Sequence, residues 1–307
     1  MEIIRPIIAL LFFPAGLFVI VTGLMYMWAD RKLVAQYQNR IGPRWFQTFA
    51  DAIKLLAKEE VVPSGVDARF FVGLPVFALA SALTAALYVP LIGLAPASNF
   101  SGDVIVAVYL LSVVTMCLAI AGSNTSSHFS LIGAVRTLTQ LFSYEAPFLL
   151  ALLGPAIVAS SWQINQVNAY ASTHWIILTQ PVGFVIAIVG LMGKLELPPF
   201  DAPEAETEIV KGALTEYSGR GLAVFHLAKA VELVVGLTLI AAFYLGGIAN
   251  PIDFFIKTLV LLLVLAGLQS LFARFRIEQT VKWWRYASLL VLAQWLVMVV
   301  LGKGVMS

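Results

Sequence analysis

An acidic residue interrupts the fourth long apolar stretch of the sequence. Glu145 lies nine residues beyond Arg136, which places it about 13 Å into a helix that starts after that arginine, at a rise of about 1.5 Å per residue. A carboxylate at this depth in hydrocarbon is costly unless it is paired, hydrated or protonated. Pro147 removes a backbone donor and is expected to kink the helix, opening room for water beside the carboxyl group. Glu145 is therefore a candidate proton-relay residue.

A later apolar stretch contains three more ionisable residues. His226, Lys229 and Glu232 are spaced three apart, so they lie close to one face of a helix. One hypothesis is a structural ion pair, between Lys229 and Glu232 or between one of them and Glu145. The other is a proton relay, because intramembrane acids that face a bundle interior are functional by default. For His226, a hydrogen-bonded buried histidine is a further alternative.

The segment between the fifth and sixth apolar stretches is crowded with carboxylates. Its six acids are Glu196, Asp201, Glu204, Glu206, Glu208 and Glu216. Like charges this close raise one another's pKa values, so we expect some of these acids to hold protons near neutrality and pass them on. Glu204 and Glu208 would share a helical face, and Glu206 would point elsewhere. Three prolines restrict the backbone, which favours a loop held in one shape over a solvated, floppy one.

The chain around these residues is too apolar for a soluble enzyme. Of its 307 residues, 60% are hydrophobic and 12% charged, and the mean hydropathy is +0.92, against about half and a quarter in soluble domains. A net charge of +2 supplies no basic surface, which excludes nucleic-acid binding. The single cysteine, Cys117, cannot hold an iron–sulfur cluster, which needs about four thiolates. We therefore expect no metal or redox cofactor on this chain, and any cluster on a partner.

Stretches of helix-spanning length predict an all-α integral membrane protein, a single polytopic domain over residues 1–307. The eight predicted spans are Pro6–Ala29, Phe70–Leu94, Asp103–Ala121, Thr137–Ser160, Trp175–Met192, Leu222–Gly246, Phe254–Ala273 and Tyr286–Leu301. The odd-numbered loops, about 30–69, 122–136, 193–221 and 274–285, carry 15 Lys or Arg, and the other loops carry none. By the positive-inside rule the odd-numbered loops are cytoplasmic and both termini are external. We expect a multi-pass protein of the cell membrane.

The first cytoplasmic loop has an amphipathic pattern. Its apolar side chains fall on one helical face and its charged ones lie away from that face; the former are Phe46, Phe49, Ile53 and Leu56, and the latter Asp51, Lys54 and Lys58. The pattern fits a helix lying at the membrane interface. A generic amphipathic connector is the alternative.

Three segments together resemble the large membrane subunit that joins the peripheral and membrane arms of respiratory complex I and of energy-converting hydrogenases, the subunit-1 or H-subunit family. The first is NRIGP at 39–43 followed by ADAIKLLAKE at 50–59. The second is SYEAP at 143–147, preceded by GSN at 122–124 and GAVR at 133–136. The third is PFDAPEAE at 199–206, continuing to EYS at 216–218. Their order and placement cover essentially the whole chain.

This resemblance implies a subunit that carries no redox centre, docks cluster-bearing partners through its cytoplasmic loops, and couples electron transfer to ion movement. The family's acidic proton path matches Glu145, Asp201, Glu204, Glu206 and Glu208, with Glu216 next to them. His226, Lys229 and Glu232 lie outside the matched motifs and rest on the burial argument. Docking of the peripheral arm falls to Arg40, Gly42, Pro43, Asp51, Lys54, Lys58, Glu59 and Arg136. The two arginines could instead be ordinary positive-inside anchors.

The compact first loop distinguishes branches of the family. The stretch 44–49 closes directly a gap that respiratory members fill with a second Gly-Pro element, so the chain looks most like subunits of membrane-bound nickel–iron hydrogenases and their sulfur-reducing relatives. That branch implies hydrogenase-like large and small partners carrying 4Fe–4S clusters and a nickel–iron site, antiporter-like membrane neighbours and surrounding lipid. The terminal acceptor, and the choice between protons and sodium ions, stay open.

Three alternatives remain open. A quinone-chamber subunit of an oxidoreductase fed by NADH, a deazaflavin or ferredoxin would be favoured by a pocket for an isoprenoid tail beside Phe46 and Phe49. A stand-alone secondary transporter would show inverted repeats and broken helices at matching positions, and the sequence predicts neither. A purely structural anchor would keep its buried acids in satisfied pairs that carry no protons.

Overall fold

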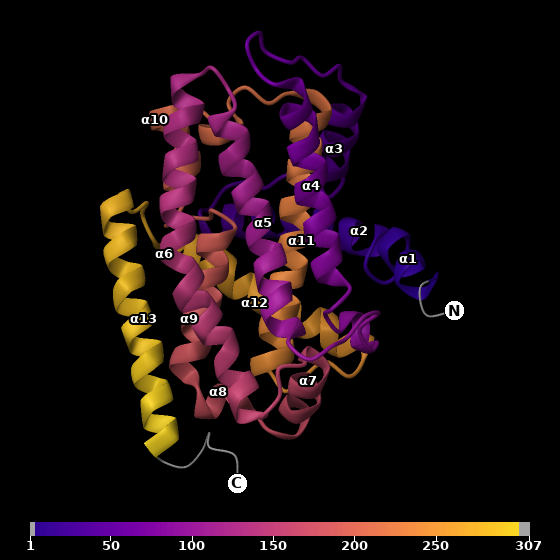
Figure 1. Cartoon of the computed structure of the whole chain (residues 1–307), viewed down its shortest axis with the longest axis vertical. Coiled ribbons are helices and arrows are strands. Elements are labelled where there is room, and N and C mark those ends of the chain that lie inside the picture. The colour runs from indigo at the N-terminus through magenta and orange to yellow at the C-terminus, as the bar shows by residue number, and fades with distance from the viewer. Residues whose placement is uncertain (1–3, 301–307) are drawn as a thin grey trace.

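The computed structural model describes residues 4–300, and all the regular elements in that range are helices. An upright bundle (Figure 1) is formed by α4 (Ala68–Ala86), α5 (Asp103–Ser123), α6 (His128–Val158), α9 (Pro181–Lys194), α11 (Gly219–Tyr244), α12 (Pro251–Leu271) and α13 (Ile277–Val300). Helix α13 packs against α6 and α9 at one side of the bundle. The predicted all-α fold class is confirmed.

Helix α11 is the core of the bundle. All its residues from Val231 to Tyr244 are buried, as expected of a helix that is hydrophobic all round. It packs against α4, α2 (Leu17–Tyr37) and α3 (Gln47–Ala57). Gly23 allows the backbones of α2 and α11 to approach each other closely, because a Cβ there would lie 2.5 Å from the carbonyl oxygen of Ala230. This contact fixes the register between α2 and the charged part of α11.

Six helices among the described residues are long and apolar enough to cross a membrane: α4, α5, α6, α11, α12 and α13. The other two predicted spans are broken, contrary to the sequence-based expectation. The first divides between α1 (Ile4–Leu11) and α2, around Pro14, and the fifth divides between α8 (Ile176–Thr179) and α9, which begins at Pro181. Proline lacks the N–H that continues a helix and suits its first turn, which explains both breaks. The count of eight and the external termini stay predictions, since residues 1–3 and 301–307 lie outside the described range.

The fourth span begins nine residues earlier than predicted. Helix α6 starts at His128, so the loop expected at 122–136 shrinks to residues 124–127. The additional turns are covered by η3 (Gly212–Leu214) of the acidic segment, against which Gly133 and Ala134 are buried. This cover was invisible to a reading of apolar runs, because the packing partner lies some 80 residues away in the sequence.

The first loop contains the predicted amphipathic helix, α3. It is anchored on its polar side, where the Thr48 hydroxyl donates a hydrogen bond to the carbonyl of Leu24 at 3.0 Å. The side chains of Phe46, Ile53 and Leu56 are exposed, so much of the apolar face points away from the bundle. An exposed apolar face on a short helix beside spans is what an interfacial helix presents.

Short helices complete the connections. Between α4 and α5 lies η1 (Leu91–Gly93), and between α6 and α8 lies α7 (Ile164–Thr173), at the end of the bundle opposite α3 and α10 (Figure 1). The acidic segment between α9 and α11 forms η2 (Ala202–Glu204), α10 (Glu206–Ile209) and η3. It folds back over α6 and α5, so the loop is structured, as its prolines predicted.

Candidate functional site

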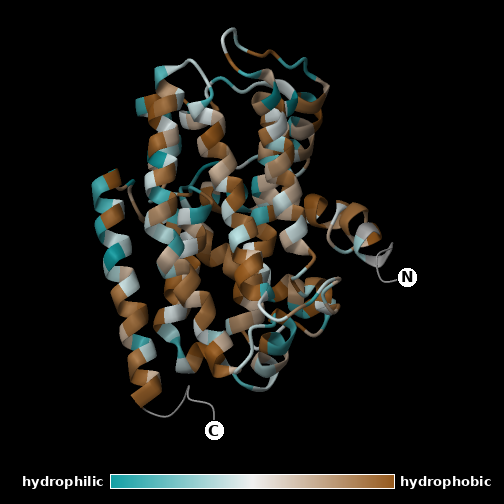
Figure 2. Ribbon diagram, in the orientation of Figure 1, coloured by the Kyte–Doolittle hydropathy of each residue, from teal (hydrophilic) through white to brown (hydrophobic). Residues whose placement is uncertain are grey.

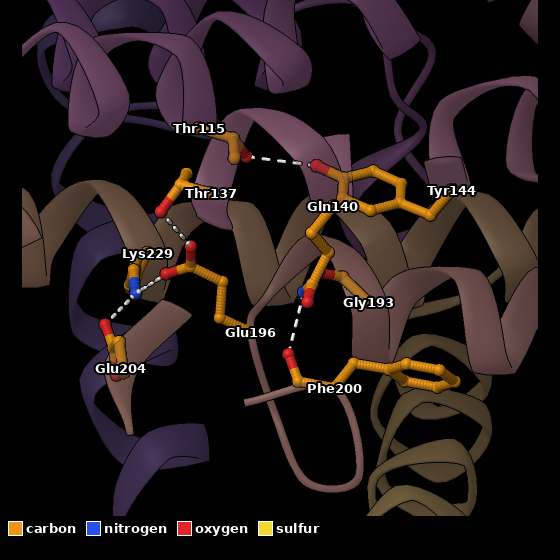
Figure 3. Close-up of polar contacts among 9 residues, drawn as sticks. All are labelled: Thr115, Thr137, Gln140, Tyr144, Gly193, Glu196, Phe200, Glu204 and Lys229. Carbon is orange, nitrogen blue, oxygen red and sulfur yellow. Dashed lines mark hydrogen bonds and ion pairs between the residues drawn. The ribbon is translucent and has the colours of Figure 1, made fainter. Parts of the chain in front are cut away.

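Lys229 is the centre of a buried polar cluster in which α11 meets the acidic segment. Its ammonium lies 2.7 Å from Glu196 Oε2 and also pairs with Glu204. The second oxygen of Glu196 accepts a hydrogen bond of 3.2 Å from the Thr137 hydroxyl of α6. Figure 3 shows the three ionisable side chains converging. We call Glu196, Glu204, Lys229 and Thr137 the outer cluster.

A second cluster lies on α5, α6 and α9. The Ser112 hydroxyl donates to Glu145 Oε1 at 2.5 Å and receives a hydrogen bond of 2.8 Å from the Lys194 ammonium. Lys194 Nζ also lies 3.5 Å from Glu145 Oε2, and its side chain is fully buried. The ammonium sits over the Tyr144 ring, 5.3 Å from its centroid, which is within reach of a cation–π interaction. We call Ser112, Glu145 and Lys194 the inner cluster.

Glu232 is a buried acid within range of the charges of both clusters. It follows Lys229 by nearly one turn of α11, is fully buried, and neither carboxyl oxygen has a hydrogen-bond partner among the described residues. The charges that act on it are those of Lys194, Lys229, Glu196 and Glu145, members of both clusters. A buried polar group without a partner is costly, so Glu232 is either protonated or hydrated. Such a group can accept and release a proton between the clusters.

The acidic segment is fixed in place by neutral and charged contacts. Gln140 of α6 is buried and donates to the carbonyls of Gly193 at 2.9 Å and Phe200 at 2.7 Å (Figure 3). The ring of Phe200 packs on Trp284 of α13, with 4.7 Å between centroids. The Gln140 amide therefore links α6 to the end of α9 and to the acidic segment, and the Phe200 ring links the segment to α13.

Two arginines pair with acids on the outer side of the segment. Arg136 lies 2.7 Å from Glu208 and also donates to the carbonyl of Ala202 at 3.2 Å. Arg274 binds Asp201 through two hydrogen bonds of 2.8 and 2.6 Å. Such two-point contacts orient a carboxylate as well as attracting it. Asp201 and Glu208 therefore hold the loop, and the outer cluster lies beneath them.

The acids of the segment do not shift in one direction: the pKa is raised for Glu196 and lowered for Glu204 and Glu208. Burial raises the pKa of Glu196, and the nearby Lys229 charge offsets only part of that effect. Burial also acts upward on the pKa of Glu204, but the Lys229 charge outweighs it and the pKa lies below its usual value. The hydrogen bond and charge of Arg136 lower the pKa of Glu208. Burial decides the direction for Glu196, and specific cationic partners decide it for Glu204 and Glu208.

Several predicted relationships between site residues are absent from the structure, and some predicted site residues lie outside the clusters. Glu204 and Glu208 do not share a helix, since they fall in η2 and α10 and turn to different partners, so that prediction was wrong. Glu206 and Glu216 have no ion pair or hydrogen bond among the described side chains. His226 is half-buried and lines two cavities. The pairs proposed between Lys229 and Glu232 or Glu145 are not formed, because Lys229 is taken by Glu196 and Glu204.

The residues predicted to dock a peripheral arm are mostly accessible. Arg40, Lys54, Lys58 and Glu59 are exposed on α3 and its flanking loops. The neighbouring Gly42, Pro43 and Asp51 are partly buried. Arg136 differs, because its side chain is 26% exposed and engaged by Glu208. In this structure Arg136 holds the acidic segment, a role that neither docking nor anchoring to the membrane surface anticipated.

Four cluster residues were not among the predicted site: Thr137, Lys194, Glu196 and Ser112. Lys194 is the last residue of an apolar helix of 14 residues. It is therefore a cation in an apolar stretch, which is the signal that identified Lys229. Glu196 was counted among the crowded acids but not selected, although it is the most buried of the acids in that loop. Ser112 gave no signal, because one serine in an apolar helix commonly bonds its own backbone, as Ser112 also does with Val108.

Two adjoining cavities lead to the outer cluster. One, of about 280 Å³, lies between α2, the acidic segment and α11, and its polar lining comprises Asp30, Arg31, Glu196, Glu204, His226 and Lys229. The other, of about 210 Å³, lies between α2, α3 and α11 and is lined by Arg31, Asp51, Lys54, Lys211 and His226 among others. Phe46 and Phe49 line neither cavity. The described residues contain no group of His, Cys, Asp and Glu that could hold a metal ion.

The fold and these clusters define a class: polytopic helical membrane proteins with clusters of buried ionisable side chains. Comparison with known proteins gives the family. Residues 8–300 match the family described as NADH dehydrogenase. The chain is 33% identical over 286 residues to the H-subunit of NADH-quinone oxidoreductase from Carboxydothermus hydrogenoformans, covering 88% of this chain and 81% of the relative. The chain therefore belongs to the NADH dehydrogenase family of membrane subunits.

Other comparisons agree on family and fold. The corresponding H-subunit from Dehalococcoides mccartyi strain 195 is 31% identical over 288 residues, covering 90% of this chain and 81% of that protein. The solved structure of the membrane-bound sulfane sulfur reductase, an archaeal respiratory membrane complex, contains a chain that matches with a TM-score of 0.84 at 21% identity, over 95% of this chain and 98% of that one. At that identity the likeness concerns the fold. The predicted family resemblance is confirmed.

Proposed function

We propose that this chain is the membrane anchor and coupling subunit of a complex I-like respiratory complex in the cell membrane. It relays redox energy from a peripheral arm to ion translocation and carries no redox centre itself. One observation supports the coupling role above others: a cluster at the acidic segment and a cluster at the middle of α6 both place charges within range of the buried Glu232, which has no hydrogen-bond partner among the described residues. The family membership supports the setting, a multisubunit respiratory complex.

The burial of these groups gives the relay a direction. Glu204 is 43% exposed and Glu145 is 17% exposed, whereas Lys194 and Glu232 between them are fully buried. A proton would enter at Glu204, pass within the outer cluster to Glu196, and reach Glu145 through Glu232. Lys194 and Lys229 stabilise each carboxylate after it releases its proton. A change of charge or shape at the partner alters the pKa values of Glu196 and Glu204 and so drives the transfer.

Partners are assigned by where the exposed charges lie. We propose that α3 and its flanking loops, with Arg40, Lys54, Lys58 and Glu59, bind hydrogenase-like large and small subunits that carry 4Fe–4S clusters and, in the hydrogenase branch, a nickel–iron site. Glu145 would pass its proton, or a sodium ion bound in place of that proton, to an antiporter-like neighbour in the membrane. The short loop 44–49 supports this branch.

A quinone-linked complex is the second candidate, favoured by the name of the NADH-quinone oxidoreductase relatives. The cavity between α2, α3 and α11 would be the place for a quinone head. Its volume of about 210 Å³ is below the roughly 300 Å³ at which sites for small molecules begin.

Nickel and iron content per copy of this chain in the purified complex separates the hydrogenase branch from the other candidates. Nickel indicates a hydrogenase, and iron without nickel indicates a sulfur- or quinone-reducing complex.

The test of coupling is Glu232→Gln, which keeps the shape of the side chain and removes its proton exchange. Turnover and ion uptake are measured together in proteoliposomes that contain the whole complex. We expect ion uptake per turnover to fall by about tenfold or more, the loss typical of removing a positioned acid–base group. Glu278→Gln, at an exposed acid of α13, is the matched control. Unchanged uptake per turnover would exclude the relay, and loss of assembly with normal coupling would indicate a structural anchor.

A further inference from the structure

A second kind of site lies on the lipid-facing side of the bundle, away from the buried clusters. A groove of about 390 Å³ is enclosed by α9, α12, α13 and the Pro199–Phe200 part of the acidic segment. All of its lining residues are apolar or aromatic, and its volume lies within the range of ligand sites. The groove has no titratable group, so it plays no part in the relay.

The groove opens on the outside of the bundle rather than toward its interior. Val185 of α9 is 54% exposed, and Val264 and Phe272 at α12 are 37% and 50% exposed. Figure 2 shows α9 predominantly apolar. Hydrocarbon is the solvent for such a surface, and a chain of hydrocarbon fills a dry apolar groove without desolvation of polar groups.

Positive charge is concentrated where the groove ends, at the connection between α12 and α13. The connection and the first turns of α13 carry Arg274, Arg276, Lys282 and Arg285 against a single acid, Glu278. Asp201 neutralises Arg274. The other three cations are exposed and form no ion pair with any described residue. Arg276 and Lys282 directly adjoin Phe275 and Trp283, two residues that line the groove.

We propose that this groove is a binding site for an anionic phospholipid, with one hydrocarbon chain in the groove and the phosphate on Arg276 and Lys282. An apolar slot ending at unpaired cations is complementary to an anionic amphiphile, because basic side chains near a membrane surface attract anionic lipid headgroups. A zwitterionic lipid carries its own cation and loses that attraction. The proposal does not rest on the relay function.

The lipid would support the acidic segment from outside. The backbone N–H of Phe275 donates to the Pro199 carbonyl at 2.9 Å, and the Phe200 ring lies 5.4 Å from that of Trp283. The same connection holds Asp201 through Arg274. A filled groove thus stabilises the connection on which the segment rests, and an emptied one leaves Phe275 and Trp283 without cover.

Native mass spectrometry of the complex purified in mild detergent tests the proposal. The complex is depleted of lipid and titrated separately with dioleoyl phosphatidylglycerol and dioleoyl phosphatidylcholine. We expect one tightly held phosphatidylglycerol per copy of this chain, bound about tenfold more tightly than phosphatidylcholine, or about 1.4 kcal/mol. Val264→Trp, which fills the groove, should abolish that tight binding. Leu263→Trp, at an exposed neighbour outside the groove, should leave it unchanged.

A charge variant tests the headgroup contact separately. Lys282→Glu should weaken phosphatidylglycerol binding and leave phosphatidylcholine binding as it was. The proposal is overturned if Val264→Trp keeps the tightly held lipid, if the two lipids bind alike, or if an electron-density map of the complex shows a partner helix in the groove. None of these results depends on ion pumping, so they test the lipid site independently of the proposed relay.

Discussion

Glu145 and Lys194 are brought together in the middle of the bundle from helices 49 residues apart in the sequence. The ammonium lies 3.5 Å from one carboxyl oxygen, and Ser112 links the pair through bonds of 2.5 and 2.8 Å to the acid and the base. A carboxylate in hydrocarbon requires such compensation. The pair therefore makes Glu145 tolerable as an anion and keeps it able to take a proton.

The first prediction concerns this pair. Lys194→Met should destabilise the complex by about 3–5 kcal/mol, because removing one partner of a buried ion pair leaves the other charge uncompensated. Adding Glu145→Gln in the same chain should recover most of that loss, since no buried charge then remains. Thermal unfolding of the single and double variants measures both effects. Additive losses would show that the two side chains are energetically independent.

The second prediction concerns pH dependence at Glu196, whose pKa is raised by burial. Coupled transport should fall on the acidic side, where Glu196 stays protonated and cannot accept a further proton. Thr137→Val removes a hydrogen bond that favours the carboxylate, so the acidic limb of ion uptake against pH should move to higher pH. Thr139→Val is the control, because that hydroxyl bonds only its own helix, at the Val135 carbonyl. If both valine variants shift the limb alike, Glu196 does not set it.

The third prediction concerns the amide that holds the acidic segment. Gln140→Leu leaves the Phe200 carbonyl without its donor, at a cost of about 1–3 kcal/mol for that unsatisfied group, and removes one of the donors of the Gly193 carbonyl, which still accepts from the Glu196 N–H. The segment should loosen, and trypsin should cleave faster after the exposed Lys211. Gln38→Leu, at an exposed position after α2, should leave the cleavage rate unchanged. Equal rates in both variants would mean that the segment is held by its other contacts.

The sequence predicted the helical membrane fold and the identity of most acids, because apolar length and buried charge are local signals. It did not predict which charges meet. One hypothesis paired Lys229 with Glu232 on its own helix or with Glu145, because the spacing of three residues shows only which side chains share a helix face. Glu196 and Glu204 reach Lys229 from a loop whose path depends on Gln140 and Phe200, and no local pattern encodes those contacts.

The boundaries of the spans failed for a related reason. The start of α6 was placed after Arg136 because that arginine ends the apolar run. The structure continues the helix back to His128, where buried Ser130 and Gly133 face η3 instead of lipid. A helix face that packs on protein need not be apolar, so hydropathy alone does not locate the end of such a helix.

The fourth prediction tests that packing through two glycines. A Cβ at Gly133 would lie 2.6 Å from the Gly212 Cα, and backbone cannot yield as a flexible side chain can. Gly133→Ala should therefore push η3 away from α6, destabilise the complex and reduce ion uptake per turnover, because Glu204 and Glu208 belong to the same segment. Gly267→Ala is the matched control, since a Cβ there meets nothing within 4 Å. That variant should instead stabilise α12 by up to about 1 kcal/mol through helix propensity. Thermal unfolding gives the two signs directly, and stabilisation by both variants would show that α6 and the acidic segment are not in backbone contact.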